Sequence, residues 1–515
     1  MDPRVSWPEL MAATSLAADT GMGLPLETGL ATCLVSMRLA ERLGLEPGEL
    51  RRTYHLSLLQ HIGCTSASAT VAEVVGDEIL MREHSATLDF SDQGQVLRFM
   101  LSHVARANPL AARPRALVRA LMGGPRIMAT VDDLCEAAMM LGARCGYAAE
   151  SVLDIGAIYE SWDGSGLPGN LSGERIPVPT RVVQVATLAV NGGRLLGAEA
   201  TAALIRARSG RVLAPEVVDS FLADPVSMRE PLDATDSLWD AVIAVEPAPE
   251  RPPDDADIDT ALEALADFAD FKSRWLLGHS RGVSELARDA TRAFGLPEEE
   301  AIRVGRAGLV HDIGKVGVSS AIWDATRPLK PDEVERVRMH PYYTNQVLAR
   351  TPFLRSLAEV ASCHHERLDG SGYHRGLRGP GLSAAARVLA AADAYRTKTE
   401  ARPHREALSP ADAAAHVRAE AAAGRLDDAA VEAVLLAAGA PSDRPPQPRL
   451  TAREIEILCQ VARGGSMREI ARALAISPKT VDGHLQRIYP KIGVSTRSGA
   501  TLYALEHGLV GENSP

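Results

Sequence analysis

The chain has 515 residues, enough for about three domains, and its composition of 46% hydrophobic but only 4% aromatic residues predicts alanine- and leucine-rich helices, not β-sandwiches or barrels. A formal net charge of −11 excludes a general affinity for nucleic acid or anionic membranes, so DNA contact would need a local basic patch. Six cysteines without CxxC pairs, no apolar run near the roughly 20 residues that span a bilayer, and no signal peptide at the N-terminus predict a cytoplasmic protein without a membrane partner.

Two stretches rich in proline and charge, residues 246–258 and 441–449, have the composition of solvated linkers. They separate segments 1–245, 259–440 and 450–515. The first two segments repeat each other, because LLQHIGCT at residues 58–65 aligns with LVHDIGKV at residues 309–316, and a later DGSG loop recurs with the helical pattern that follows it. A stretch around residues 84–144 occurs in the first segment and has no counterpart in the second.

The middle segment carries histidines and aspartates at wide intervals, and seven of them form a predicted ligand set: His279, His311, Asp312, His340, His364, His365 and Asp393. Imidazole and carboxylate without thiolate suit a first-row metal such as iron or manganese. Seven ligands are too many for one closed tetrahedral zinc site. The segment is therefore predicted to hold two adjacent divalent cations.

Two residues of this segment are predicted to take part in chemistry directly. We expect Asp312 to bridge the cations, with His311 and Asp393 on one of them and the remaining histidines on the other. Lys315 follows His311 by four residues, so the two side chains would share one face of a helix. An ammonium group there can neutralise charge that builds up on phosphoryl oxygens, next to water that the cations make acidic.

Three motifs carry a family resemblance: VHDIGKV at residues 310–316, CHHERLDGSGYHRGL at 363–377 and AADAYRTKTEARPHREAL at 391–408. Residues 257–439 resemble an HD-GYP domain, the phosphodiesterase branch of the HD superfamily that hydrolyses cyclic di-GMP with two or three metal ions. The resemblance implies that the same seven residues are metal ligands and that Lys315 lies at the scissile phosphate. It also implies that Arg402 and Arg405 contact the phosphates of the substrate.

Two positions depart from the family pattern. His374 is the third residue of the GYP signature, so the loop that shapes the substrate pocket is expected to be altered. Trp275 stands four residues before the first ligand histidine, where members with three metals carry a glutamate. We therefore expect two metals, and phosphodiester chemistry follows from the motifs more directly than cyclic di-GMP as the substrate.

The first segment has lost the ligand positions while it keeps the loop and the helical pattern. The residues that replace His279, His311, Asp312, Lys315, His364, His365 and Asp393 are Thr28, Gln60, His61, Cys64, Ile158, Tyr159 and Thr187. A fold can persist without its chemistry because packing depends on volume and periodicity. The segment is predicted to be a metal-free HD-GYP-like domain, and sensing, dimerisation and scaffolding remain open as its role.

The last segment has clear helix signals. Thr451 with Glu454 and Ser466 with Glu469 are predicted capping boxes, and Ser477 is a predicted N-cap before a proline. Two helices joined at residues 475–477 make a helix-turn-helix, with residues 478–491 as the recognition helix. The segment resembles a LuxR-type DNA-binding domain, and its eight basic and six acidic residues give it a net charge of +2.

The predicted DNA contacts are Lys479, Thr480, His484, Arg487, Lys491 and Arg497. Lys479 and Thr480 near the start of the helix would reach bases or phosphates, while the later arginines and Lys491 would contact phosphates. A small helical docking module is the alternative. DNA-binding domains of this kind span two half-sites, so we expect a homodimer on double-stranded DNA.

Together the segments predict an all-α protein with two tandem HD-type helical domains and a C-terminal helix-turn-helix domain. The predicted function is a DNA-binding transcriptional regulator whose central domain binds a dinuclear metal centre and senses or hydrolyses a phosphodiester such as cyclic di-GMP. The alternative is a metal-dependent cyclic-dinucleotide phosphodiesterase whose main output is turnover and whose DNA-binding domain is regulatory.

Overall fold

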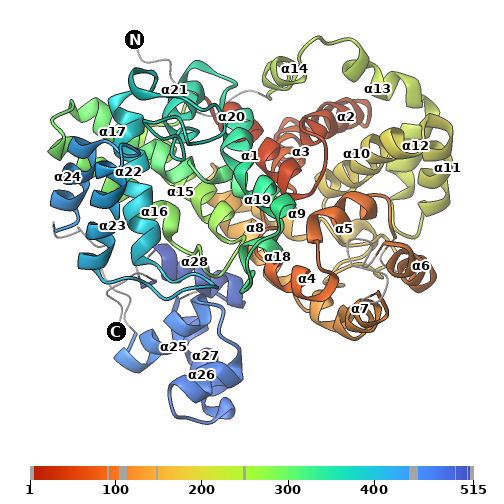
Figure 1. The fold of residues 1–515 in the computed structure, drawn as a ribbon. Helices are drawn as coiled ribbons and strands as arrows, with labels where there is room; N and C mark the ends of the chain where they lie inside the picture. Colours follow the sequence, from red (N-terminus) through yellow and green to blue (C-terminus); the bar gives the residue numbers. More distant parts are fainter. Residues whose placement is uncertain are drawn as a thin grey trace. The chain divides into compact units, whose positions relative to one another are not determined.

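The structure is a computed structural model, and it describes residues 5–89, 92–103, 113–146, 149–247, 251–439, 450–492, 494–506 and 509–510. Within these ranges the chain forms helices and loops and no strand (Figure 1). This confirms the all-α fold class that the composition predicts. None of the described helices is both long and apolar enough to cross a membrane.

The chain divides into two compact units, and the boundary lies between Ala261 and Leu262, inside helix α15 (Asp255–Asp270). We call residues 5–261 the N-terminal unit and the residues from 262 onward the C-terminal unit. The boundary follows the first proline-rich stretch, so the two repeated segments fall in different units.

The N-terminal unit has α2 and α10 packed against each other and against α3 at its centre. Its core is apolar and includes Leu39, Val182, Val185 and Phe221, all buried. Its helices are α1 (Trp7–Gly21), α2 (Thr28–Arg42), α3 (Pro47–Leu59), α4 (Ser68–Val75), α5 (Glu78–Ser85), α6 (Gln93–His103), α7 (Arg113–Met128), α8 (Val131–Arg144), α9 (Ala149–Gly156), α10 (Val178–Leu195), α11 (Ala198–Arg208), α12 (Pro215–Ala223), α13 (Pro225–Asp233) and α14 (Leu238–Ala244), with the 3₁₀ helix η2 (Gly173–Arg175).

The stretch around residues 84–144, predicted to have no counterpart in the second segment, forms α6, α7 and α8. Helix α7 packs against α4, and Val71, Val74, Phe99 and Ala120 make a small apolar cluster of their own. Helices α6 and α7 therefore add a small apolar cluster to the unit. The prediction was wrong for α8: a Cβ added to Gly63 would lie 2.2 Å from the carbonyl oxygen of Leu134 in α8, as one added to the matching Gly314 would lie 2.0 Å from that of His340, the first residue of α20 (His340–Leu348).

In the C-terminal unit, α16 packs against α17, α22 and α24. The packing with α17 is close: a Cβ added to Gly308 of α17 would lie 2.8 Å from Cα of Ser284 in α16. The helices that precede the last segment are α16 (His279–Ala293), α17 (Glu298–Val310), α18 (Ser320–Trp323), α19 (Pro331–Arg338), α20 (His340–Leu348), α21 (Pro352–Ala361), α22 (Ala384–Thr399), α23 (Pro410–Ala422) and α24 (Asp428–Ala437), with the 3₁₀ helices η3 (Ile313–Gly317) and η4 (Gly379–Gly381).

Each unit has its own buried aspartate that accepts a hydrogen bond at the start of a helix. In the C-terminal unit the backbone N–H of Ser280 donates to Asp270 at 3.0 Å, at the beginning of α16. In the N-terminal unit the N–H of Gly29 donates to Asp19 at 3.1 Å, at the beginning of α2. Each carboxylate satisfies an N–H that the first helical turn leaves without a partner.

Each unit also has a glutamate whose carboxylate accepts hydrogen bonds from the backbone that follows the DGSG motif. Glu160 accepts hydrogen bonds from the backbone N–H groups of residues 169, 170 and 171 at 2.8–3.1 Å. Glu366, at the matching position, accepts from those of residues 375 and 377 at 2.7 and 2.9 Å. The peptide bond is cis at the matching place in both loops, Leu167–Pro168 and Tyr373–His374. His374 therefore stands in a loop whose glutamate anchor is the same as in the first copy.

The last segment folds as α25 (Ala452–Ala462), α26 (Met467–Ala473), α27 (Pro478–Ile492) and α28 (Arg497–Glu506). Both predicted capping boxes are confirmed, at Thr451 and at Ser466. Helix α25 packs on α27 and α28, and α26 packs on α27. The pair α26 and α27 forms the predicted helix-turn-helix.

Candidate metal centre

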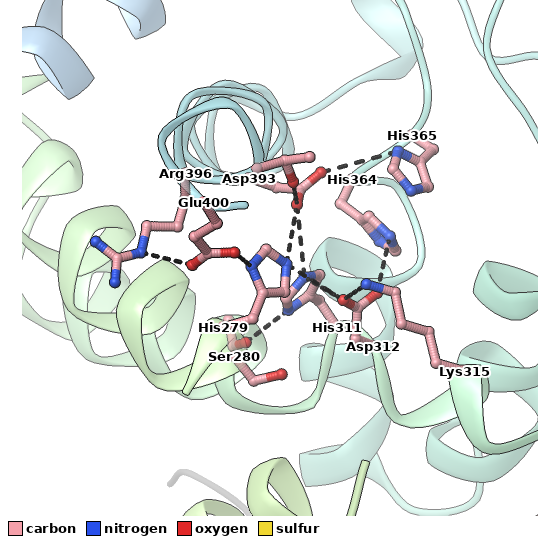
Figure 2. Close-up of polar contacts among 12 residues, drawn as sticks. His279, Ser280, His311, Asp312, Lys315, His364, His365, Asp393, Arg396 and Glu400 are labelled. Atoms are coloured by element: carbon pink, nitrogen blue, oxygen red, sulfur yellow. Dashed lines mark hydrogen bonds and ion pairs between the residues drawn. The ribbon is translucent and has the colours of Figure 1, made fainter. Parts of the chain in front are cut away.

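The predicted ligands come from the ends of helices that are far apart in the sequence. His279 is the first residue of α16, His311 and Asp312 follow α17, and His340 is the first residue of α20. The pair at 364–365 follows α21, and Asp393 lies in α22. Figure 2 shows that the labelled ligands point toward one another: His279, His311, Asp312, His364, His365 and Asp393.

Asp312 lies at the middle of the cluster, and its two oxygens face different histidines. Oδ2 is 3.4 Å from Nε2 of His279 and 3.1 Å from Nε2 of His311. Oδ1 is 3.4 Å from Nε2 of His340 and 3.5 Å from Nε2 of His364. Such a carboxylate has one oxygen available for each of two cations.

The protein fixes which nitrogen of each histidine faces the centre. Nδ1 of His311, His340 and His364 donates to a backbone carbonyl three residues earlier, at 2.7, 2.6 and 2.6 Å. Because Nδ1 carries the hydrogen in each ring, Nε2 presents its lone pair to the centre. This is the arrangement by which proteins prepare a histidine for metal ligation.

The pair His340 and His364 fits a cation well. Their Nε2 atoms are 3.0 Å apart. Burial lowers the pKa of His340 to about 4 and that of His364 to about 3, so both rings are neutral at pH 7. With both Nδ1–H groups donated to carbonyls, neither Nε2 has a hydrogen to share, and two lone pairs face each other. A cation between them would turn this repulsion into coordination.

Other buried atoms of the centre also lack hydrogen-bond partners. Within the described residues, Nε2 of His279, Nε2 of His311 and both oxygens of Asp312 make no hydrogen bond of normal geometry. Burial opposes ionisation of Asp312, yet His311 and Lys315 hold the pKa of its carboxyl well below the usual range. A buried charge of this kind needs compensating positive charge, of which Lys315 supplies part. The donor set and its buried, unsatisfied atoms thus fit two divalent metals.

Asp393 completes one side of the centre. Its Oδ1 is 3.4 Å from Nε2 of His279 and 3.8 Å from Nε2 of His311, and its Oδ2 is 3.8 Å from Nδ1 of His365. Two groups of possible ligands result: His279, His311 and Asp312 in one, and His340, His364 and His365 in the other. The expected distribution was wrong for His279, which lies with His311 and Asp393, because α16 packs against α17 and α22.

Lys315 reaches the centre by a different route from the expected one. Helix α17 ends at Val310, and Lys315 lies in the 3₁₀ helix η3, so it does not share an α-helical face with His311. Its ammonium group instead forms an ion pair with Asp312. Lys315 is only 8% exposed, which places its charge inside the site.

The sequence reasoning missed Glu400. Its Oε2 accepts a hydrogen bond from Nδ1 of His279 at 2.8 Å, and Arg396 binds the same carboxylate at 2.9 Å (Figure 2). Arg402 also donates to this carboxylate, at 2.8 Å. Burial would lower the pKa of His279, but Glu400 and the neighbouring aspartates outweigh it and raise that pKa to about 10. Spacing gives no signal for it, because Glu400 lies one residue past the end of α22 and its partner His279 is 121 residues away in the sequence.

We expect Glu400→Gln to weaken metal binding, because a neutral amide cannot orient and polarise His279 as a carboxylate does. Loss of such an outer partner typically costs 10- to 100-fold in metal affinity, so we expect about that range here. Competition with a chelator, followed by metal analysis, measures the affinity. Glu406→Gln, a nearby exposed glutamate, is the matched control. Equal affinity for the wild type and Glu400→Gln would contradict this role.

The two arginines predicted to contact substrate have partners in the protein. Arg402 donates to the backbone carbonyl of Trp275 at 2.7 Å as well as to Glu400. Arg405 donates to the carbonyls of Lys398 and Glu400 at 3.2 and 3.0 Å. Both guanidinium groups therefore brace the end of α22, and their contact with a substrate stays a prediction.

In the N-terminal unit, side chains bond to one another at the positions that match the centre. The hydroxyl of Thr187 donates to Gln60 at 2.9 Å, and Sγ of Cys64 lies 3.5 Å from the hydroxyl of Tyr159. Burial lowers the pKa of His61 to about 4, so it is neutral at pH 7. No group of possible metal ligands occurs among the described residues of this unit.

The predicted DNA contacts fall into two sets. Lys479, Thr480 and Arg487 are exposed on α27, and His484 is half-buried on the same helix. The ammonium group of Lys491 instead lies 2.6 and 2.7 Å from the oxygens of Glu454. Arg497 donates to the carbonyls of residues 461 and 465 at 2.9 and 2.7 Å. The last two side chains therefore hold the domain together. We expect the ion pair to keep Lys491 from adding a phosphate contact, while the DNA contact of Arg497 stays a prediction.

Comparison with known proteins identifies families for two parts of the chain. Residues 263–430 match the family described as HD domain, and residues 448–504 match the family described as bacterial regulatory proteins, luxR family. The 3'3'-cGAMP-specific phosphodiesterase 3 of Vibrio cholerae is 30% identical over 420 residues, which cover 80% of this chain and 90% of that protein. The cyclic di-GMP phosphodiesterase response regulator RpfG of Xanthomonas campestris is 32% identical over 177 residues, 34% of this chain and 46% of that protein.

A solved structure shares the fold over most of the chain. The crystal structure of a cyclic GMP-AMP specific phosphodiesterase of V. cholerae has a TM-score of 0.58 and 24% identity, and the match covers 85% of this chain and 99% of that one. The similarity to the curated V. cholerae relative extends well beyond the HD domain. The chain therefore belongs to the HD-GYP-type family of cyclic-dinucleotide phosphodiesterase homologues, and its HD domain is followed by a luxR-family helix-turn-helix domain.

Proposed function

We propose that the protein is a DNA-binding transcriptional regulator whose HD domain holds two divalent metal ions and hydrolyses a 3'3'-linked cyclic dinucleotide. The observation that carries this proposal is the pair of neutral imidazoles, His340 and His364, whose Nε2 atoms are 3.0 Å apart beside the two-sided carboxylate of Asp312. The ligand chemistry suits iron or manganese. When bound, such cations supply Lewis acidity to a phosphoryl group and make water acidic at neutral pH.

The residues of the chain would divide the remaining work. Hydrolysis adds the oxygen of water to one phosphorus, breaks its bond to one ribose oxygen, and leaves a linear dinucleotide with a terminal phosphate. The ammonium of Lys315, on the edge of the centre, would offset negative charge on the phosphoryl oxygens. Arg402 and Arg405 are proposed to contribute positive potential near the second phosphate, in addition to their structural contacts.

The relatives guide the choice of substrate. The V. cholerae relative that matches 80% of the chain is named for 3'3'-cGAMP, whereas relatives named for cyclic di-GMP match 21–34% of it. We therefore propose 3'3'-cGAMP first and cyclic di-GMP second. A regulator that binds the dinucleotide without turnover is the second candidate function, favoured by the DNA-binding domain that follows the HD domain.

The remaining parts would serve DNA binding. We propose that residues 1–245 form a degenerate HD-GYP-like domain without metal, since its Gln60 and Thr187 bond to each other where the second copy has ligands. Residues 450–515 would bind double-stranded DNA as a homodimer, and the degenerate domain is a candidate for holding the two chains together.

Turnover of purified full-length protein tests the proposal. After loading with manganese, or with ferrous iron without oxygen, we expect 3'3'-cGAMP to yield a linear dinucleotide that chromatography resolves. Cyclic di-GMP and a non-cyclic dinucleotide are the comparison substrates. If the protein bound metal but formed no product, only the second candidate function, a regulator that senses the dinucleotide, would remain. A shift in DNA affinity on adding the dinucleotide would then support this function. If the protein bound neither metal nor dinucleotide, both candidate functions, the enzyme and the sensor, would be refuted.

A further inference from the structure

Lys315 lies in the short 3₁₀ helix η3, and a side chain of helix α18 binds its backbone. The 3₁₀ helix η3 is only five residues long, and the hydrogen-bond geometry of such tight helices is poorer than that of an α-helix. The backbone carbonyl of Lys315 accepts one hydrogen bond from the N–H of Val318 at 3.0 Å and another from the indole Nε1–H of Trp323 at 3.2 Å. Trp323 thus holds the backbone of Lys315 from outside its own turn.

The same indole also faces the functional end of Lys315. The ammonium nitrogen lies 5.4 Å from the centroid of the Trp323 ring, within the range of a cation–π interaction. On another side the ring packs edge-to-face with the imidazole of His340, with 5.9 Å between centroids. One side chain therefore contacts both the lysine proposed to meet the phosphate and a proposed metal ligand.

Helix α18, which carries Trp323, is anchored at both ends. The hydroxyl of Ser319 caps it by accepting from the N–H of Ala321 at 3.2 Å. The hydroxyl of Ser320 donates to the carbonyl of Lys272 at 2.7 Å, and Asp324 accepts a hydrogen bond from Ser273. The helix is tied to the segment after α15, so the indole is presented by a fixed platform.

We propose that Trp323 is a positioning residue, which sets where the ammonium of Lys315 lies relative to the metal centre and so controls turnover more than metal content. In the present structure Asp312 also binds that ammonium. Cations that take the Asp312 oxygens would weaken this ion pair, and the indole face would then remain as the contact that orients Lys315. The inference rests on the proposed function.

Two variants separate the contacts of the indole. Trp323→Phe keeps an aromatic face for the ammonium and for His340 but removes the Nε1–H donor, while Trp323→Leu removes both. With 3'3'-cGAMP as substrate and metal content measured in parallel, we expect Trp323→Leu to lower kcat by about 10- to 100-fold, as expected for a misplaced catalytic group. Trp323→Phe should fall between it and the wild type, with metal content and melting temperature near the wild-type values for both.

A second readout does not depend on activity. The chain has six lysines, so reductive ¹³C-methylation of the metal-free protein gives few NMR signals, and Lys315→Arg identifies the one from Lys315. The ring current of Trp323 should displace this signal. We expect the displacement to persist in Trp323→Phe and to vanish in Trp323→Leu.

The proposal is overturned if Trp323→Leu keeps the wild-type kcat or if its loss of kcat only parallels a loss of metal. It is also overturned if the NMR signal of Lys315 has the same position in Trp323→Leu as in the wild type. If the wild-type chain hydrolyses no cyclic dinucleotide, the proposed function fails instead. The NMR signal of the metal-free protein still decides in that case whether Trp323 holds Lys315.

Discussion

Asp312→Ala is expected to remove both metals and to abolish turnover. Asp312 offers one oxygen to each group of histidines, at 3.1–3.5 Å from four Nε2 atoms, so its loss leaves neither cation with a carboxylate bridge. Metal catalysis contributes several kcal/mol of transition-state stabilisation, and each 1.36 kcal/mol is tenfold in rate, so kcat should fall at least about 1,000-fold. Metal analysis of the purified protein and chromatography of the products measure the two effects.

The N-terminal unit supplies the matched control. His61 stands at the position that matches Asp312, and His61→Ala should leave the metal content of the chain and its turnover unchanged. Because Asp312 is fully buried, Asp312→Asn is a second variant that keeps the volume of the side chain. Asp312→Ala with a full complement of metal, or with wild-type turnover, would refute the bridging role.

The double variant Lys479→Ala, Arg487→Ala is expected to weaken DNA binding and to lower its dependence on salt. Both side chains are exposed on α27, the predicted recognition helix. Each phosphate contact contributes roughly 0.9 to the slope of log K against log salt concentration, so the loss of two contacts should reduce the slope by about two. Titration of a DNA target at several salt concentrations gives the slope, and an unaltered slope would count against these contacts.

Lys491→Met is the control for that experiment, since it removes one positive charge from the same helix. The Lys491 ammonium is paired with Glu454, so we expect a loss of domain stability and no change in the salt slope. The lysine side chain is 43% exposed, and solvent screens the pair, so the destabilisation should be about 1 kcal/mol. A slope reduced by about one would instead make Lys491 a phosphate contact.

The fold class could be predicted from local patterns, and the membership of the metal cluster from its histidine and aspartate motifs and their resemblance to the HD-GYP family. Low aromatic content and helical periodicity indicate helices, and the HD and HH pairs stand at helix ends where side chains can converge. Capping boxes at Thr451 and Ser466 involve residues three positions apart, so their geometry follows from spacing alone. These predictions needed no knowledge of how helices pack.

The division of the cluster depends on packing between distant segments, which spacing does not reveal. His279 lies with His311 and Asp393 because α16 packs on both α17 and α22. Glu400 and Trp323 were missed for the same reason: each acts on a residue that another helix carries. Spacing also does not reveal which charged side chains bond inside the protein. Four side chains whose charges suggest phosphate contacts make such hydrogen bonds: Arg402, Arg405, Lys491 and Arg497.

Anomalous X-ray diffraction from crystals of the full-length chain, grown with manganese or iron, tests the dinuclear centre most directly. We expect two peaks at the metal's absorption edge, one on each side of the Asp312 carboxylate. The first should lie among His279, His311 and Asp393, and the second among His340, His364 and His365. A single peak, or a peak away from Asp312, would contradict a dinuclear centre bridged by Asp312.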